Sequence, residues 1–157
     1  MSTQFSRILL PTDFSEAGRP AAACACEMAR QFNSVLSCLH VVDESYQYWS
    51  AMGPEPVIVG PPPQELIEAA KQRLSRYCAE YLRSLLQPAQ ENVSMGSPFA
   101  EIIGYAKEHS IDLIVMGTHG RGAIAHALLG GTTEKVIRKA PCAVLTVRAS
   151  SHQFEAP

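Results

Sequence analysis

Hydrophobic residues occur along the chain in five short runs, separated by longer segments with a different rhythm. Short apolar runs that end in proline, glycine or polar residues are typical of strands buried on both faces of a parallel sheet. We therefore predict five strands, at 7–11, 35–42, 92–96, 112–116 and 143–147.

Between these runs, apolar residues recur every three or four positions, which is the spacing of an amphipathic helix. The spacing predicts helices over 16–32, 64–86, 98–109 and 133–139. Ser15 and Ser97 stand where helix N-caps are expected, with Pro98 at the first helical position. Pro88 is expected to end the second helix.

This alternation of strands and helices predicts an α/β fold, a three-layer sandwich with helices on both faces of a parallel sheet. We expect the strand order 3-2-1-4-5, because strands 1 and 4 both end in an abrupt Pro or Gly turn. Two such turns side by side would form the crevice in which doubly wound sheets bind ligands. The 157 residues are expected to form one domain, 1–157, with its core at about 5–148.

Charge and hydropathy narrow the class of protein. The formal net charge is −2, whereas nucleic-acid and anionic-membrane binders usually carry a basic face. No apolar run approaches the ~20 residues of a membrane span, and we see no secretory signal. The cysteine count, five, is odd, and we interpret these residues as buried, reduced thiols. Together these features favour a cytoplasmic protein that binds neither nucleic acid nor membranes.

The candidate chemistry lies in the glycine-rich stretch 116–135. Gly117 and Gly120 follow a predicted buried strand, where glycine allows a sharp turn and close approach of the backbone to a ligand. The run Gly130–Thr133 directly precedes a helix, whose first N–H groups and positive dipole end favour a phosphate. Two such turns suit a di- or triphosphate. The alternative is purely structural, because glycine pairs also end helices and form tight turns.

The spacing of Gly117, Gly120 and Gly130 resembles the motif of the universal stress protein family: Gly, two residues, Gly, nine residues, Gly, then Ser or Thr. The segments 8–15, 96–102, 113–121 and 134–148 are similar to the same family, so the resemblance spans roughly residues 5–148. It implies a five-stranded Rossmann-like fold, an ATP-binding branch with Mg²⁺ as a candidate companion, and a homodimer joined through the last strand, Ala143–Val147.

The resemblance also implies a set of nucleotide-contacting residues. Those at the adenosine end would be Pro11, Thr12, Asp13 and Val41; those along the ribose and phosphates would be Met116, Gly117, Gly120, Gly130, Gly131, Thr132 and Thr133. Apart from the resemblance, we add His119 and Arg121 as candidates, because they lie beside the motif glycines. Gly131 departs from the family pattern, which has Ser or Thr there. One hydroxyl donor to a phosphate is therefore absent, and Thr132 or Thr133 is the candidate to replace it.

Several of these residues have a second interpretation. Asp13 would either accept a hydrogen bond from the nucleoside or help to cap the following helix. His119 is expected near the ligand without a catalytic role, since no nucleophile and base arrangement accompanies it. Arg121 would either approach phosphate or lie in solvent, and His40 is expected to be a hydrogen-bonded core residue. We therefore expect a binding protein with at most slow, incidental ATP hydrolysis.

Residues 43–63 interrupt the alternation with a long proline-rich loop. Loops of this length are usually functional, and the aromatic residues Tyr46, Tyr48 and Trp49 would suit a protein partner. The alternative function is therefore a nucleotide-free protein-interaction module of the same fold.

Overall fold

A parallel sheet of five strands forms the centre of the protein. The computed structural model describes residues 4–44, 60–119 and 129–149. Within these ranges the strands are β1 (Arg7–Pro11), β2 (Val35–Asp43), β3 (Gln90–Gly96), β4 (Leu113–Gly117) and β5 (Ala143–Val147). Their order is β3-β2-β1-β4-β5, and each neighbouring pair is parallel. The predicted fold class and strand order are confirmed.

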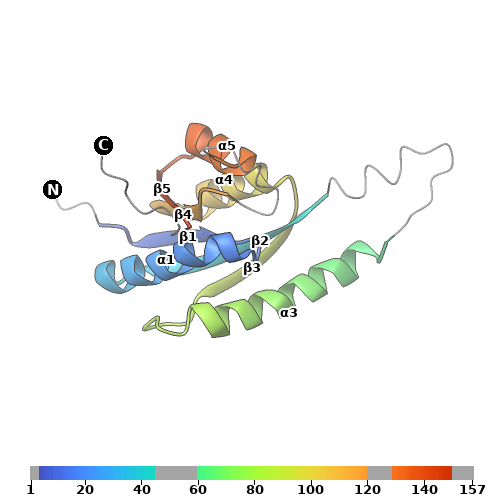
Figure 1. Ribbon diagram of the computed structural model, residues 1–157, viewed down its shortest axis with the longest axis horizontal. Helices are drawn as coiled ribbons and strands as arrows, with labels where there is room; N and C mark the ends of the chain where they lie inside the picture. Colours follow the sequence, from blue (N-terminus) through green and yellow to red (C-terminus); the bar gives the residue numbers. More distant parts are fainter. Residues whose placement is uncertain (1–3, 45–59, 120–128, 150–157) are drawn as a thin grey trace.

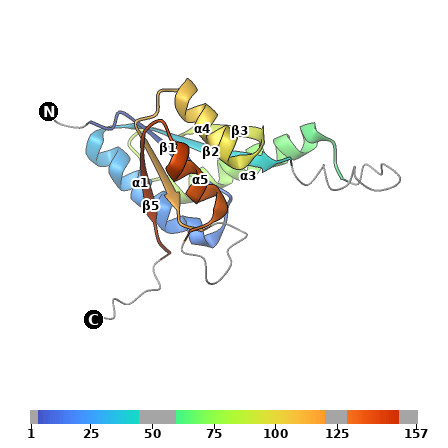
Figure 2. The same ribbon diagram turned by 90° about the horizontal axis from the view of Figure 1, so that it is seen from above.

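Helices cover both faces of the sheet. Figure 1 shows α1 (Arg19–Phe32) and α3 (Pro63–Tyr81) on one face, and α4 (Pro98–Glu108) and α5 (Gly131–Lys139) on the other. Figure 2 shows α5 beside α4 on the same face; α4 packs against β2 and β3, and α5 packs against β5. The three layers are those expected when every strand-to-strand crossover contains a helix.

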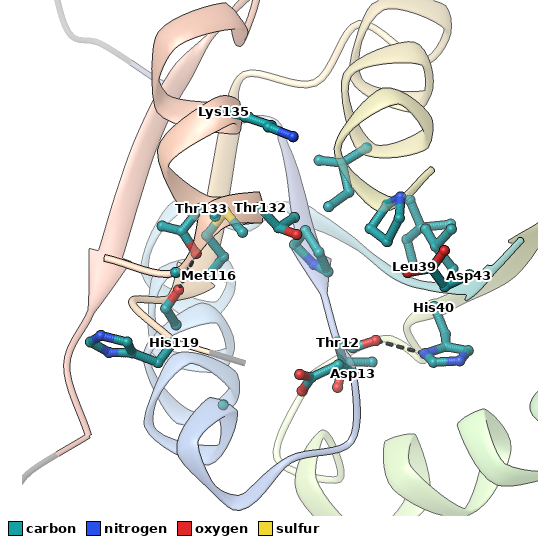
Figure 3. Close-up of a pocket in the computed structure, with 18 of the residues that line it drawn as sticks. Thr12, Asp13, Leu39, His40, Asp43, Met116, His119, Thr132, Thr133 and Lys135 are labelled. Atoms are coloured by element: carbon teal, nitrogen blue, oxygen red, sulfur yellow. Dashed lines mark hydrogen bonds between the residues drawn. The ribbon is translucent and has the colours of Figure 1, made fainter. Parts of the chain in front are cut away.

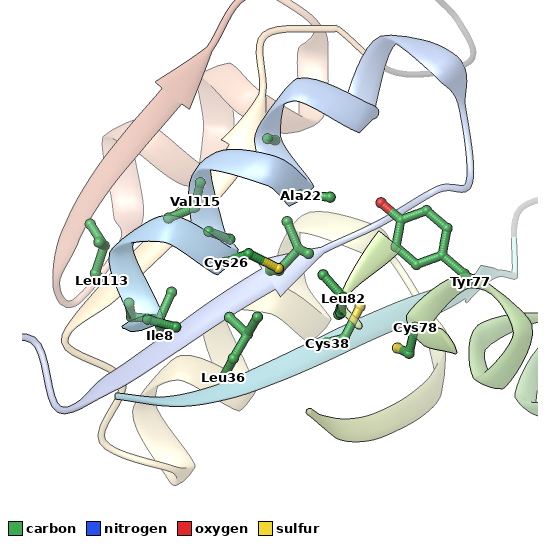
Figure 4. Packing of buried hydrophobic residues seen from close by; sticks show 14 of the residues in the cluster. Ile8, Ala22, Cys26, Leu36, Cys38, Tyr77, Cys78, Leu82, Leu113 and Val115 are labelled. Atoms are coloured by element: carbon green, nitrogen blue, oxygen red, sulfur yellow. The ribbon is translucent and has the colours of Figure 1, made fainter. Parts of the chain in front are cut away.

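The central strand β1 supplies side chains to two hydrophobic cores. Ile8 and Leu10 point to the α1/α3 side, while Leu9 points to the α4/α5 side, because successive strand residues face opposite ways. All three are 1% exposed or less. Figure 4 shows the first core, in which Ile8 lies among side chains from α1, β2 and α3. Because both faces of β1 are buried, the residues at its carboxyl end are held in a fixed position relative to the sheet.

The five cysteines are unpaired thiols. Cys26, Cys38 and Cys78 are buried in the first core, as expected, whereas Cys24 and Cys142 are half-buried. A hydrogen bond with Cys78, together with burial, raises the pKa of the Cys38 thiol. A raised pKa keeps this thiol protonated and unreactive at neutral pH.

Two predicted helices differ by several residues from their bounds in the structure, and α5 starts at Gly131 rather than at 133. The helix expected over 16–32 starts as a short 3-10 helix, η1 (Glu16–Gly18), and α1 follows with Pro20 in its first turn. Ser15 and Ser97 occupy N-cap positions, but neither side chain makes a capping hydrogen bond. The Ser15 hydroxyl is instead buried without a partner among the described residues.

The helix expected over 64–86 ends at Tyr81, well before Pro88. Leu82 leaves the helical conformation with φ −110° and ψ 14°, which starts the turn toward β3. That turn is required because Gln90 must reach the position beside Ser37 on β2. The apolar spacing continues to Leu86, but this side chain is 75% exposed and does not hold the helix to the core.

Candidate functional site

The carboxyl ends of β1, β2 and β4 open into one cleft. Its volume is about 660 Å³, within the range of roughly 300–1,000 Å³ typical of small-molecule sites. Figure 3 shows the cleft between the N-terminal turn of α5, the start of α4 and the residues that follow β1. From β1 the chain adds strands on one side of the sheet, β2 and β3, and then on the other side, β4 and β5. The cleft lies at this switch between β1 and β4, as expected for a ligand crevice in a doubly wound sheet.

The residues predicted to contact a nucleotide line this cleft wherever the structure describes them. They are Pro11, Thr12, Asp13, Val41, Met116, Gly117, His119, Gly130, Gly131, Thr132 and Thr133. Gly120 and Arg121 lie outside the described residues, as do residues 45–59 of the long loop. Segments far apart in the sequence are therefore brought together as the prediction required.

Thr12 uses all its polar groups to hold the end of β1. Its amide donates to the Leu39 carbonyl at 2.9 Å, and its carbonyl accepts from Nδ1 of His40 at 2.8 Å. Its hydroxyl accepts from the Phe14 amide at 3.0 Å and is also hydrogen-bonded to the phenol of Tyr77. Thr12 thus fixes the neighbouring residue, Asp13, at the cleft rather than serving mainly as a ligand donor.

Phe14 is held by aromatic and cationic contacts on the far side of this turn. Its φ of 63° lies in the left-handed region, which is costly for a bulky residue. The ring stacks on His40 at 4.2 Å and meets Tyr77 edge-on at 5.6 Å, and the Arg73 guanidinium lies 4.5 Å above it. Two of these partners come from α3, so that helix braces the turn after β1.

Asp13 serves the turn and the cleft together. One carboxylate oxygen accepts from the Ser15 amide at 2.9 Å, which closes a local turn before η1 rather than capping the helix α1. Figure 3 shows the carboxylate near the floor of the cleft. A carboxylate has four lone-pair positions, so the local bond is compatible with accepting a ligand hydroxyl as well.

The backbone of Gly117, at the end of β4, lies close to η1 and to the first turn of α5. A Cβ at this position would lie 3.4 Å from the carbonyl oxygens of Ala17 and His119, closer than most such contacts. The Gly117 carbonyl accepts from the Thr133 hydroxyl at 2.9 Å, and Thr133 is only 4% exposed. Both residues therefore have a structural role, which is to dock α5 onto the end of β4.

The N-terminus of α5 faces the cleft with backbone donors. The Gly130 amide is used internally, donating to the Thr118 carbonyl at 2.7 Å, and the Glu134 amide donates to Gly130. The amides of residues 131–133 have no carbonyl one turn earlier to bond within the helix. With the positive end of the helix dipole, they form a site suited to a phosphate group.

Gly131 itself is open to the cleft. A Cβ there would meet no atom within 4 Å, so the structure does not require glycine at this position. The hydroxyl missing from the family pattern could be accommodated without moving the backbone. Thr132, which lines the cleft half-buried, is placed to supply a hydroxyl in its stead.

Sequence reasoning missed several residues of the cleft. They are Gly18, Leu39, His40, Val42, Asp43, Pro98, Ile102 and Lys135. The neighbours of Val41 on β2 could have been predicted, since consecutive residues at the carboxyl end of a parallel strand lie at the same edge of the cleft. Pro98 and Ile102 could not, because nothing in the sequence indicates how far α4 leans over the sheet.

Two histidines, His40 and His119, line the cleft. His40 is hydrogen-bonded as expected, but it is half-buried at the cleft rather than within the core. His119 lies at the side of the cleft opposite His40 in Figure 3, with Nδ1 3.1 Å from the Thr118 hydroxyl. His109, at the end of α4, is half-buried and stacks on Tyr105 at 3.9 Å.

Charge is distributed unevenly along the cleft. Asp13 and Asp43 line the side formed by the ends of β1 and β2, whereas Lys135 and the α5 N-terminus line the other side. Among the described residues, no group of three or more His, Cys, Asp or Glu side chains could hold a metal ion. The arrangement suits a ligand with hydrogen-bond donors at one end and negative charge at the other.

Comparison with known proteins identifies the family. The chain matches the universal stress protein family over residues 4–148. It belongs to that family. A universal stress protein of Thermus aquaticus is 35% identical over 150 residues, covering 92% of this chain and 99% of that protein. One of Methanocaldococcus jannaschii is 31% identical over 151 residues, covering 92% of this chain and 82% of that protein.

Solved structures of universal stress proteins share the fold. Universal stress protein UspA from Lactobacillus plantarum superposes with a TM-score of 0.74 at 28% identity, covering 94% of this chain and 100% of that one. A universal stress protein solved in complex with cAMP has a TM-score of 0.67 at 23% identity, covering 94% and 100%. One from Archaeoglobus fulgidus, solved with dAMP, has a TM-score of 0.60 at 20% identity, covering 92% and 98%.

Within the ranges that the structure describes, none of the helices combines the length and the apolarity needed to cross a bilayer.

Proposed function

We propose that this universal stress protein binds an adenine nucleotide, ATP in particular, in the cleft at the ends of β1, β2 and β4. The observation that carries the proposal is the polarity of the cleft. The carboxylates of Asp13 and Asp43 suit the hydroxyl and amine donors of a nucleoside, and the α5 N-terminus suits its phosphates. Two proteins of this fold that were solved with cAMP and dAMP make adenine nucleotides the first ligands to test.

In the proposed orientation, the base lies beside Val41 and the polyphosphate lies along Met116–Gly117 toward Thr132. The amides of residues 131–133 donate to phosphate oxygens, and the Thr132 hydroxyl adds a donor that Gly131 lacks. Thr133 and Gly117 keep α5 against β4 through their 2.9 Å hydrogen bond. Mg²⁺, where present, is held chiefly by the phosphates, as is usual for this ion.

The protein acts in this proposal through nucleotide occupancy, as a signal in a stress response, rather than through turnover. The residues near the phosphate end are Thr132, Thr133, two glycines, His119 and Lys135, a set suited to binding and orienting phosphates. The Thr118 hydroxyl contacts Nδ1 of His119, but Thr118 is buried and does not line the cleft, so this pair is not placed to attack a bound nucleotide. Hydrolysis of bound ATP is therefore expected to be slow and incidental.

Thermal unfolding gives a first test of the proposal. A ligand that binds only the folded state adds RT ln(1 + [L]/Kd) to the free energy of unfolding, so Mg-ATP should raise the Tm in proportion to the logarithm of its concentration. Inorganic triphosphate and adenosine, tested separately, should each give a smaller shift. A Tm that does not respond to any of the three would contradict nucleotide binding.

The alternative is a nucleotide-free interaction module, favoured by glycine rather than Ser or Thr at position 131. Its partner surface would include the loop 43–63, most of which lies outside the described residues. Under this alternative, deletion of residues 46–60 abolishes capture of a protein partner, and ATP leaves the Tm of the wild type unchanged.

We further propose that two copies pair through β5. This strand is at the edge of the sheet, bonded to β4 on one side, and its residues Val144–Val147 are only half-buried. An exposed edge of low charge is a template for another strand, and two-fold pairing covers both edges in a closed dimer.

A further inference from the structure

Lys135 is a cation at the phosphate end of the cleft. It stands three residues after Thr132 on α5, so the two residues share one face of the helix, and both line the cleft. Figure 3 shows its side chain extending from α5 across the upper edge of the cleft toward α4. A long, flexible stem allows the ammonium group to reach ligand atoms beyond those that the backbone amides contact.

The ammonium group of Lys135 shares an aromatic platform with a second lysine. Its Nζ atom lies 5.3 Å from the ring centroid of Phe99, the second residue of α4. Nζ of Lys139 lies 5.5 Å from the same centroid. The two lysines are four residues apart on α5, and like charges at this spacing repel one another. Two like charges therefore share one aromatic ring at the phosphate end of the cleft.

The rest of α5 does little to neutralise Lys135. The Glu134 carboxylate, which is next in sequence, pairs with Arg138 at 2.8 Å. The ion pairs formed between described residues do not include Lys135. Lys139 lies in the last turn of α5, where the helix dipole favours a cation, whereas Lys135, the fifth of its nine residues, gains no such stabilisation. An anion in the cleft would offset the repulsion between the two lysines.

We propose that Lys135 makes the cleft selective for polyphosphate, so that a nucleoside triphosphate binds better than the monophosphate. The inference rests on the proposed nucleotide site. The amides at the α5 N-terminus take the first phosphate groups of either ligand. Only a longer polyphosphate extends far enough for its outer oxygens to meet the Lys135 ammonium group, which then leaves Phe99 to Lys139.

The test is calorimetric titration of the full chain with ATP and with AMP. Lys135→Ala should weaken ATP binding about fivefold, equivalent to about 1 kcal/mol for one exposed charge contact. It should change AMP binding by less than about twofold, since the charge is then farther away and screened by salt. Lys135→Arg should restore most of the preference for ATP, and raising the salt concentration should reduce the difference between wild type and Lys135→Ala.

Lys139→Ala is the matched control, because it removes the same charge from the same ring at a position that does not line the cleft. It should leave the ATP-to-AMP preference unchanged. The Tm of the unliganded protein distinguishes a structural role of Lys135 from a role in ligand binding. If Lys135 acts only on the ligand, Lys135→Ala should not lower this Tm. Equal losses for ATP and AMP, or equal losses from the two alanine variants, would overturn the inference alone. Wild-type protein that binds neither nucleotide would overturn the proposed site together with it.

Discussion

At the level of single residues, the cleft depends on side chains that hold the backbone more than on side chains that point at a ligand. Thr12 illustrates this, because its amide, carbonyl and hydroxyl all bond within the protein. Thr133 behaves in the same way at the other wall, donating its hydroxyl to Gly117. Residues that match a family motif can therefore contribute to binding by fixing the amides and carboxylates beside them.

The pH dependence of stability tests how the Tyr77 phenol supports Thr12 and the turn after β1. Burial raises the pKa of Tyr77 from 10.0 to about 12. The folded state therefore holds this proton more tightly than the unfolded chain does. The resulting stabilisation is complete below pH 10 and is lost as the pH rises through 12.

Tyr77→Phe should lower the free energy of unfolding by about 1 kcal/mol at neutral pH, the worth of the hydrogen bond to Thr12. Its stability should then fall less steeply than that of the wild type between pH 10 and 12. Denaturant unfolding across this range measures both effects. Tyr105→Phe, which changes a tyrosine on α4 away from the cleft, is the control. Parallel pH profiles for wild type and Tyr77→Phe would show that the phenol does not brace the turn.

At the level of elements, the junction between β4 and α5 separates structural from ligand-directed groups on adjacent residues. Thr133 is buried and bonded to Gly117, while Thr132 is half-buried and lines the cleft. The two threonines occupy the second and third positions of the same helix. Their hydroxyls thus differ in role although the sequence Thr132-Thr133 looks uniform.

Replacing each threonine by valine should separate these roles. Thr133→Val should lower the free energy of unfolding by roughly 1–3 kcal/mol, because it removes the hydrogen bond that the buried Thr133 side chain donates to the Gly117 carbonyl. Thr132→Val should leave stability within about 0.5 kcal/mol, as for an ordinary surface change, but should weaken ATP binding. Urea unfolding and nucleotide titration of both variants measure the difference. The reverse outcome, with Thr132→Val the less stable variant, would contradict the assignment.

The same elements show what sequence reasoning could and could not predict. The strand order followed from the abrupt ends of β1 and β4, and the motif glycines located the cleft. The early end of α3 was missed because apolar spacing continues to Leu86, whereas the need to align Gln90 with Ser37 is a tertiary constraint. The place of Lys135 at the cleft was not predicted because it depends on how α5 packs beside α4, where its ammonium group lies near Phe99.

At the level of the whole molecule, the open edge of β5 lies on the α5 side of the ligand cleft in the strand order. Pairing of two copies along this edge would extend one sheet across both subunits. Light scattering should give a mass of twice 17.0 kDa for the wild type. Thr146→Lys, which places a charge on the edge, should reduce the mass to that of one chain.

Asn92→Lys adds the same charge to β3, at the opposite edge of the sheet, and should leave the dimer intact. A dimer that survives Thr146→Lys but not Asn92→Lys would place the interface on β3. A wild-type mass of one chain would remove the dimer from the account without affecting the cleft.

Calorimetric titration with Mg-ATP tests the central claim, that the backbone amides in the first turn of α5 bind the polyphosphate of a nucleotide held in the cleft. The wild type should bind one ATP per chain. Gly131→Ser should bind it more tightly, because a side chain there meets no atom within 4 Å and adds a hydroxyl at the phosphate end. No heat of binding from either protein up to about 1 mM nucleotide, where an interaction of about 4 kcal/mol would be detected, would contradict the claim.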